Sequence, residues 1–140
     1  MKKRLFAIFA AFCFAMVAMA QDSTTFKGYL YNEEYQVYLD IDFYHKNKLV
    51  PGQEIFGELP GYFGAKRDTR KWLITDISFT NSTTVQLSII NDYGSEDLTA
   101  TLHKEKDGKY ILKQGEGSTI KIAVNRKWVK IPKTLELIKK

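Results

Sequence analysis

The stretch that decides the fold occupies residues 35–44 and reads Tyr35-Gln36-Val37-Tyr38-Leu39-Asp40-Ile41-Asp42-Phe43-Tyr44. Apolar and more polar side chains alternate along it, so an extended chain would have one apolar face and one mostly polar face. The β-branched and aromatic content also favours a strand. A strand with one buried and one solvated face is typical of an antiparallel sheet. Leu39 lies in the middle of the apolar face, whereas Asp40 and Asp42 lie on the solvated face.

Short segments of similar character follow one another from Phe26 to Ile138. Turn sequences such as Pro51-Gly52 and Asp107-Gly108 separate them, and residues 53–59 are among the segments that we expect to form strands. No segment after residue 20 has helical periodicity over three turns. The sequence therefore predicts an all-β fold, a single antiparallel meander of about eight to ten strands closing into a barrel, because short connections favour sequential pairing and closure removes the sheet edges. A β-sandwich is the alternative.

The N-terminal residues differ from the rest of the chain. A basic start, Met1-Lys2-Lys3-Arg4, precedes an apolar run over residues 5–17, and Ala18-Met19-Ala20 has the small-x-small pattern of a cleavage site. We therefore predict a secretory signal peptide over residues 1–20 and a single domain over residues 21–140, exported to the periplasm or the extracellular space. The apolar run is too short for a transmembrane helix, so no transmembrane span is expected.

Charge is unevenly distributed along the chain. Residues 21–103 hold 7 basic and 12 acidic residues, whereas residues 104–140 hold 11 basic and 4 acidic residues. Two interpretations are open. Basic and acidic strands lie beside each other in one sheet, or the basic C-terminal third forms a patch for an anionic polymer or lipid surface. No nucleic-acid-binding motif accompanies the basic residues, and we expect no nucleic-acid partner.

Few residues point to catalysis. Asp40 and Asp42 share one strand face, and a pair of carboxylates can serve as acid and base in a small hydrolase. However, no sequence neighbour would raise the pKa of either one. His45 and His103 lack the spacing of a metal site, and the only cysteine, Cys13, lies in the predicted signal peptide, so we expect no metal and no cofactor.

Aromatic residues offer the clearest candidates for binding. Tyr62 and Phe63 lie between Gly61 and Gly64. Exposed at a loop tip, they would serve as a platform for a sugar or as an interface anchor. The alternative, which we favour, is that one or both fold inward and close the mouth of the barrel, because burial of an aromatic ring is stabilising. Both tryptophans, at positions 72 and 128, are expected in the core.

Three segments carry a resemblance to known proteins. They are Asp97-Leu98-Thr99-Ala100-Thr101-Leu102, Tyr110-Ile111-Leu112-Lys113, and residues 120–133, which read IKIAVNRKWVKIPK. Together they resemble the C-terminal half of small exported proteins of Bacteroides-type bacteria. Asp22-Ser23-Thr24 resembles the short O-glycosylation acceptor of those bacteria. The outline of the chain is also similar to lipocalin and calycin barrels, although Gly28-Tyr29-Leu30 stands where lipocalins have Gly-x-Trp.

These features predict an exported, non-enzymatic binding or interaction module. Three kinds of partner are open: a small apolar ligand inside the barrel, a glycan at its loops, or another exported protein. The enzymatic alternative is a small hydrolase that uses Asp40 and Asp42. A further alternative is a structural or inhibitory partner of another exported protein.

We expect the exported protein to begin at Gln21, because the basic start, apolar run and small-x-small site together direct cleavage after Ala20. Intact-mass measurement of the exported protein checks this expectation. A mass that retains residues 1–20, or that includes a lipid on Cys13, would contradict it.

Overall fold

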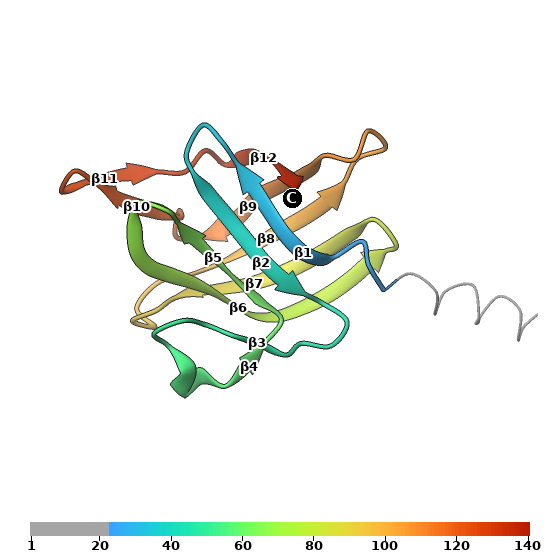
Figure 1. Cartoon of the computed structure of the whole chain (residues 1–140), viewed down its shortest axis with the longest axis horizontal. Helices are drawn as coiled ribbons and strands as arrows, with labels where there is room; N and C mark the ends of the chain where they lie inside the picture. The colour runs from blue at the N-terminus through green and yellow to red at the C-terminus, as the bar shows by residue number, and fades with distance from the viewer. Residues whose placement is uncertain (1–22) are drawn as a thin grey trace, which may run out of the picture.

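Eight antiparallel strands form a closed barrel in the computed structural model, which describes residues 23–140 (Figure 1). The predicted signal peptide and Asp22 lie outside the described residues. In order around the barrel, the strands are β1 (Lys27–Asn32), β2 (Val37–Asp42), β5 (Gly61–Ala65), β6 (Asp68–Asn81), β7 (Thr84–Asn91), β8 (Asp97–Lys104), β9 (Tyr110–Gly117) and β12 (Thr134–Lys139). The barrel closes where Leu30 and Tyr31 of β1 pair with Lys139 and Ile138 of β12. The predicted all-β fold and closed antiparallel meander are therefore confirmed.

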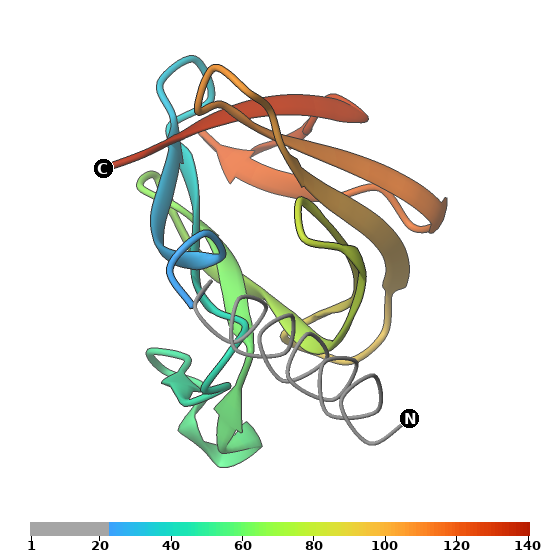
Figure 2. The same cartoon turned by 90° about the vertical axis from the view of Figure 1, so that its right-hand side faces the viewer.

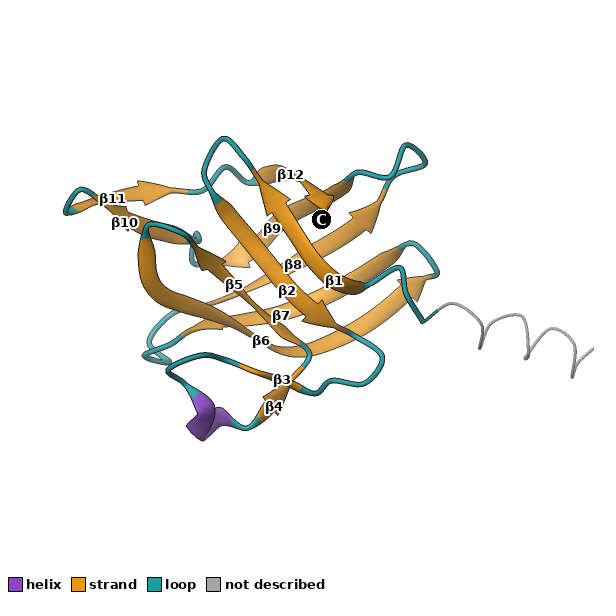
Figure 3. Cartoon of the chain, in the orientation of Figure 1, coloured by secondary structure: helices purple, strands orange, loops and turns teal. Residues whose placement is uncertain are grey.

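Two excursions interrupt the meander and extend away from the barrel (Figure 3). The first, between β2 and β5, contains β3 (Lys48–Leu49), the 3₁₀ helix η1 (Glu54–Phe56) and β4 (Glu58–Leu59). The second, between β9 and β12, is a hairpin of β10 (Lys121–Val124) and β11 (Lys127–Lys130).

The prediction of one strand over residues 53–59 was wrong. These residues form the turn of η1, and only the last part pairs as β4. Gly57 ends the helical turn with a φ of 72° and donates its backbone N–H to the Glu54 carbonyl. Ile55 and Phe56 are adjacent apolar residues, so this segment lacks the strict alternation that would favour a strand.

Side chains fill the space that the ribbons enclose in Figure 2. Leu39 is fully buried there between its cross-strand neighbours, Leu30 of β1 and Phe63 of β5. Phe26 and Phe43 stack on each other within the same cluster, with ring centroids 5.8 Å apart. The interior is thus one hydrophobic core, and the apolar face predicted for residues 35–44 is confirmed.

The long strand β6 changes face part-way along its length. Ile74 pairs with Ile89, but the register shifts between Ile74 and Asp76, so that Ile77 pairs with Leu87. A β-bulge adds one residue on one strand and thereby reverses the parity of the positions that follow. This shift explains why residues 71–79 have apolar side chains on both parities in the sequence.

The facing of β2 can be tested at two neighbouring positions. Leu39→Asp is expected to unfold the domain, because a buried unpaired charge costs several kcal/mol against a total stability of about 5–15 kcal/mol. Asp40→Asn is the matched control. It removes a partly exposed ion pair with Lys48, which is worth about 1 kcal/mol or less, and the amide oxygen of Asn can still accept the hydrogen bond from the Tyr62 hydroxyl. Thermal unfolding measured by circular dichroism separates the two variants, and equal shifts in Tm would contradict the assigned facing.

Candidate ligand-binding site

Asp42 lies on the outer face of β2, but it is buried rather than solvated, with only 3% of its surface exposed. Its carboxylate accepts hydrogen bonds from the backbone N–H groups of Tyr44 and His45, at 3.1 and 3.0 Å, and lies 2.9 Å from Nδ1 of His45. Burial on its own would raise the pKa of Asp42, but the hydrogen bonds from His45 and Tyr44 outweigh it and lower the pKa below its ordinary value. Asp42 therefore organises the turn after β2.

Asp40 is also engaged by neighbouring side chains. Its Oδ1 lies 3.0 Å from Nζ of Lys48, and its Oδ2 accepts a hydrogen bond of 3.3 Å from the Tyr62 hydroxyl. A general acid in a hydrolase needs a carboxyl group that keeps its proton near neutral pH. The lowered pKa of Asp42 does not fit that role, so the pair gives no support to the predicted hydrolase alternative.

Tyr62 and Phe63 lie within β5 rather than at a loop tip. Phe63 points into the barrel and is 1% exposed, and Tyr62 lies on the outer face at 6% exposure, in a small cluster with Val50 and Leu73. Burial, followed by the nearby charge of Asp40, raises the pKa of Tyr62. Phe63 therefore folds inward, whereas Tyr62 is buried on the outer face of β5, and a binding role for either residue stays a prediction.

Gly61 and Gly64, on either side of this pair, allow neighbouring groups to pack closely against β5. A Cβ atom on Gly61 would collide with the backbone of β2, and one on Gly64 would collide with the ring of Tyr38. Neither glycine has a positive φ. The sequence predicted a flexible loop at these glycines. In the structure they instead allow neighbouring strands and side chains to pack closely against β5.

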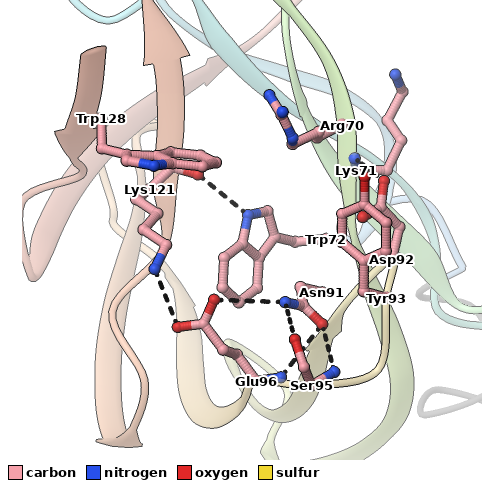
Figure 4. Close-up of a pocket in the computed structure, with 10 residues that line it drawn as sticks. All are labelled: Arg70, Lys71, Trp72, Asn91, Asp92, Tyr93, Ser95, Glu96, Lys121 and Trp128. Atoms are coloured by element: carbon pink, nitrogen blue, oxygen red, sulfur yellow. Dashed lines mark hydrogen bonds and ion pairs between the residues drawn. The ribbon is translucent and has the colours of Figure 1, made fainter. Parts of the chain in front are cut away.

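A pocket of about 230 Å³ lies near the end of the barrel that the β10–β11 hairpin covers (Figure 4). We call it the tryptophan pocket. It is lined by residues of β6, the β7–β8 turn and the hairpin, namely Arg70, Lys71, Trp72, Asn91, Asp92, Tyr93, Ser95, Glu96, Lys121 and Trp128.

Two exposed aromatic side chains flank the tryptophan pocket. Trp128 of β11 is 57% exposed and Tyr93 of the β7–β8 turn is 78% exposed, and Figure 4 shows them on opposite sides with Trp72 between. Trp72 is buried, and its Nε1 donates a hydrogen bond of 3.2 Å to the carbonyl of Lys121. The pocket thus has an aromatic base and two aromatic flanks.

Charged and polar groups surround these rings. The Arg70 guanidinium and the Lys121 ammonium lie 5.0 and 5.4 Å from the centre of the Trp128 ring, within cation–π distance. Lys121 also pairs with Glu96 at 3.2 Å. Asn91 accepts hydrogen bonds from the backbone N–H groups of Ser95 and Glu96, which fixes the shape of the β7–β8 turn. The pocket therefore offers both donors and acceptors beside flat apolar surfaces.

A basic groove of about 490 Å³ continues from the tryptophan pocket, and the two share Arg70 and Trp128. We call it the arginine groove. It runs between the β5–β6 turn and the β10–β11 hairpin, and its lining comprises Arg67, Asp68, Thr69, Arg70, Ala123, Asn125, Arg126, Lys127 and Trp128. Two basic residues of the C-terminal third, Arg126 and Lys127, line this groove together with Arg67 of the β5–β6 turn and Arg70 of β6.

Two residues form the tip of the β10–β11 hairpin. Val124 pairs with Lys127, and the residues between them, Asn125 and Arg126, have φ values of 52° and 66°. Positive φ at both central positions is the geometry of a type I′ turn, in which glycine is favoured at the second position. A side chain in this left-handed region costs about 1–2 kcal/mol, so arginine at position 126 is a strained choice.

Side chains from the barrel hold the hairpin in place. The buried amide of Gln114 in β9 accepts a hydrogen bond of 2.7 Å from the Ile120 backbone N–H and donates to the carbonyls of Ile131 and Pro132. Asp68 of β6 accepts a hydrogen bond of 2.8 Å from the Ala123 backbone N–H. Both sides of the pocket are therefore fixed to the same rigid barrel.

The expectation that Trp128 lies in the core was wrong, although Trp72 is buried as expected. Within β11, Val129 packs against the core, and Trp128 points to the opposite side. The sequence offers a signal for this facing, because Val129 and Ile131 have one parity while Trp128 shares the other with Lys130. Tyr93 was also missed, although it stands among Asn91, Asp92, Gly94 and Ser95, which are turn-forming residues.

The described residues show neither a metal centre nor a helical membrane span. No group of three or more His, Cys, Asp and Glu side chains in residues 23–140 is arranged to hold a metal ion. His45 contacts Asp42, whereas Nδ1 of His103 lies 2.7 Å from the Thr84 hydroxyl. Within the same residues, no helix has the length and apolarity needed to cross a membrane.

Comparisons of the chain with known protein families, curated proteins and solved structures found no match. The resemblance to small exported proteins of Bacteroides-type bacteria stays a prediction. Support for a function comes from the geometry and chemistry of the tryptophan pocket and the arginine groove.

The hydrogen bonds that Asp42 accepts in the turn after β2 make the free energy of unfolding depend on pH. Because its pKa in the folded state lies below the value of about 3.9 in an unfolded chain, its contribution is fully present above that value and is lost as pH falls through the folded-state pKa. Asp42→Asn is expected to lower the free energy of unfolding at pH 7 by about 1–2 kcal/mol, with the difference from wild type shrinking below pH 4. Urea titrations between pH 7 and pH 3 measure this difference. Asp76→Asn, an exposed site on β6, is the control, and a difference independent of pH would contradict the assignment.

Proposed function

We propose that the protein is an exported, non-catalytic module that binds a glycan in the tryptophan pocket. The observation that carries this proposal is Trp128, which is 57% exposed and stands beside a pocket lined with polar groups. Large aromatic side chains at a surface are typical anchors of binding sites. Rigid attachment of the hairpin through Gln114 adds support, because the aromatic platform is formed before any ligand arrives.

A sugar ring matches the chemistry of this pocket. One face of a pyranose is formed by C–H groups, which stack on the flat surface of an indole. Its edge carries hydroxyl groups, each of which both donates and accepts hydrogen bonds. Asp92 and Glu96 can accept such bonds, Arg70 and Lys71 can donate them, and Asn91 can do both. Sites of this kind combine apolar surfaces with a few well-placed polar groups.

The barrel interior gives less support to a ligand carrier. Its side chains form one packed cluster, with Phe63, Leu39 and Tyr110 each at most 2% exposed. A small apolar ligand inside the barrel would have to displace them, and close-packed interiors resist such displacement. Export of the protein is supported by the signal-peptide pattern of residues 1–20.

A protein partner is the second candidate, and a separate observation favours it. The excursion between β2 and β5 exposes three large apolar side chains, with Leu49 at 55%, Ile55 at 91% and Phe56 at 40%. Exposed apolar residues that lie together on a surface often mark contacts with another protein. This surface is formed by a different excursion from the one that carries Trp128, so the two candidates can be tested separately.

Trp128→Ala is expected to weaken glycan binding by about tenfold or more, since removal of an aromatic anchor at a binding site costs about 1–2 kcal/mol or more. The measurement is binding of the exported protein to a microarray of defined oligosaccharides, followed by calorimetric titration of those that bind. Ile55→Ala removes another exposed apolar side chain and is the matched control.

Both variants should keep the wild-type Tm to within a few degrees, because neither side chain is buried. Unchanged glycan binding by Trp128→Ala would contradict the proposed site. Loss of binding in Ile55→Ala alone would move the site to the excursion between β2 and β5.

A further inference from the structure

We infer that the glycan is acidic, and that the arginine groove binds its anionic groups while the tryptophan pocket binds a neighbouring sugar ring. This inference rests on the proposed function and adds the class of ligand to it. The two surfaces share Arg70 and Trp128, so a chain of linked sugars can pass from one to the other without leaving the protein. A ligand that occupies both surfaces is therefore an oligosaccharide rather than a single sugar.

The arginine groove has an excess of positive charge. Four cationic side chains line it, Arg67, Arg70, Arg126 and Lys127, against one carboxylate, Asp68. That carboxylate is already occupied, because it accepts hydrogen bonds from the Arg70 backbone N–H and guanidinium and from the Ala123 backbone N–H. The positive charge of the groove is therefore complementary to an anionic ligand.

Three of these cations have no acidic partner among residues 23–140. Within residues 23–140, no carboxylate lies at ion-pair distance from Arg67, Arg126 or Lys127. Lys121 differs, because Glu96 pairs with it in the tryptophan pocket. A guanidinium presents a planar fork of donors that matches a carboxylate or a sulfate in a bidentate manner. Arg67 and Arg126, each at the tip of a two-residue turn, are the side chains best placed to provide it.

The backbone at Arg126 adds an independent observation. This residue adopts a φ of 66° at a turn position where glycine would be less strained. Its side chain lines the groove, and no carboxylate of the described part of the chain pairs with it. The hairpin turn requires the positive φ, as turns do at Gln36 and Lys46, but it does not require an arginine. Binding of an anion would give an arginine a role at this position.

Acidic residues in the tryptophan pocket favour a glycan over a nucleic acid. Asp92 and Glu96 line the pocket beside Trp128. A nucleic acid carries a phosphate at every nucleotide, and these two carboxylates would repel it. An acidic glycan carries its charges on some rings and hydroxyl groups on all of them, so that a hydroxyl-rich ring can contact Asp92 and Glu96 while a charged ring reaches the groove.

The test compares matched acidic and neutral ligands. Hexamers of galacturonate carry carboxylates, their methyl esters are neutral chains of the same length, and chondroitin sulfate hexasaccharides carry both carboxylate and sulfate. Calorimetric titration with the exported protein is expected to give an affinity for the galacturonate hexamer or the chondroitin hexasaccharide at least about fivefold above that for the neutral ester. This preference should decrease as salt is raised from 50 to 500 mM.

Arg126→Gly separates binding from folding. It keeps the turn geometry and relieves the strain, so Tm is expected to stay equal or rise, while affinity for the acidic hexamers falls by about fivefold and affinity for the neutral ester does not change. Lys106→Gln removes one charge from the β8–β9 turn, which the topology places at the other end of the barrel, and it should change neither affinity.

The outcomes distinguish the two proposals. Equal affinity for acidic and neutral hexamers, with binding still dependent on Trp128, would overturn the acidic ligand and leave the glycan-binding proposal standing. If Arg126→Gly binds the acidic hexamers as tightly as the wild type does, the proposed role of the arginine groove is overturned. Tighter binding of a single-stranded oligonucleotide than of either acidic hexamer would overturn the choice of a glycan, and absence of any glycan binding would overturn both proposals.

Discussion

One buried side-chain amide connects the barrel to the surface that we propose as its binding site. Gln114 reaches from β9 to the two ends of the β10–β11 excursion, where it accepts from the Ile120 backbone N–H and donates to the Ile131 and Pro132 carbonyls. These backbone groups leave the barrel ladder at the excursion and would otherwise be buried without partners, at a cost of about 1–3 kcal/mol for each group. These three bonds hold the base of the hairpin, and the hydrogen bonds from Ala123 to Asp68 and from Trp72 to Lys121 hold β10, so the position of Trp128 depends on both sets.

One face of the β10–β11 hairpin packs against the barrel core, and the other face lines the tryptophan pocket and the arginine groove. Ile122 and Val129, a cross-strand pair, face the barrel and extend its core. Ala123 and Trp128, the neighbouring pair, face the opposite side, where Trp128 lines both the tryptophan pocket and the arginine groove. The alternation of a strand produces this division without any additional element. A surface built in this way is rigid, because the residues behind it belong to the hydrophobic core.

The sequence specifies the barrel better than it specifies the site. Residues 35–44 alternate over a full strand, and burial of Leu39 follows from that pattern. Residues 71–79 do not reveal their facing, because the shift between Ile74 and Asp76 reverses the parity, and a bulge has no clear signature in a single sequence. The glycines beside Tyr62 and Phe63 indicated a loop, although they lie where strands and rings pack closely.

Trp128 and Tyr93 illustrate why the site escaped the sequence reasoning. Tryptophan side chains are usually buried to a large extent. Applied to Trp128, this general preference gives the wrong facing unless the alternation of side chains along the four-residue strand β11 is also considered. Tyr93 stands in a turn, where local sequence favours exposure, but nothing in the sequence shows that this turn lies beside β10 and β11. That proximity arises because β8 pairs with β9, so that the excursion after Gly117 begins beside the start of β8 at Leu98, and residues about 35 positions apart in the chain come together.

The location of the site on the hairpin has a consequence for stability. Arg126 has a left-handed backbone that reduces stability, whereas Trp128 and Arg67 are exposed and add little to the core, and all three lie around one groove. Natural proteins carry such local costs where function requires them, and the core elsewhere offsets them. Leu39, Phe63 and the remaining interior side chains form a core that does not depend on these positions. The barrel can therefore keep its fold while the residues of the groove change, and variation there would alter ligand preference without altering the scaffold.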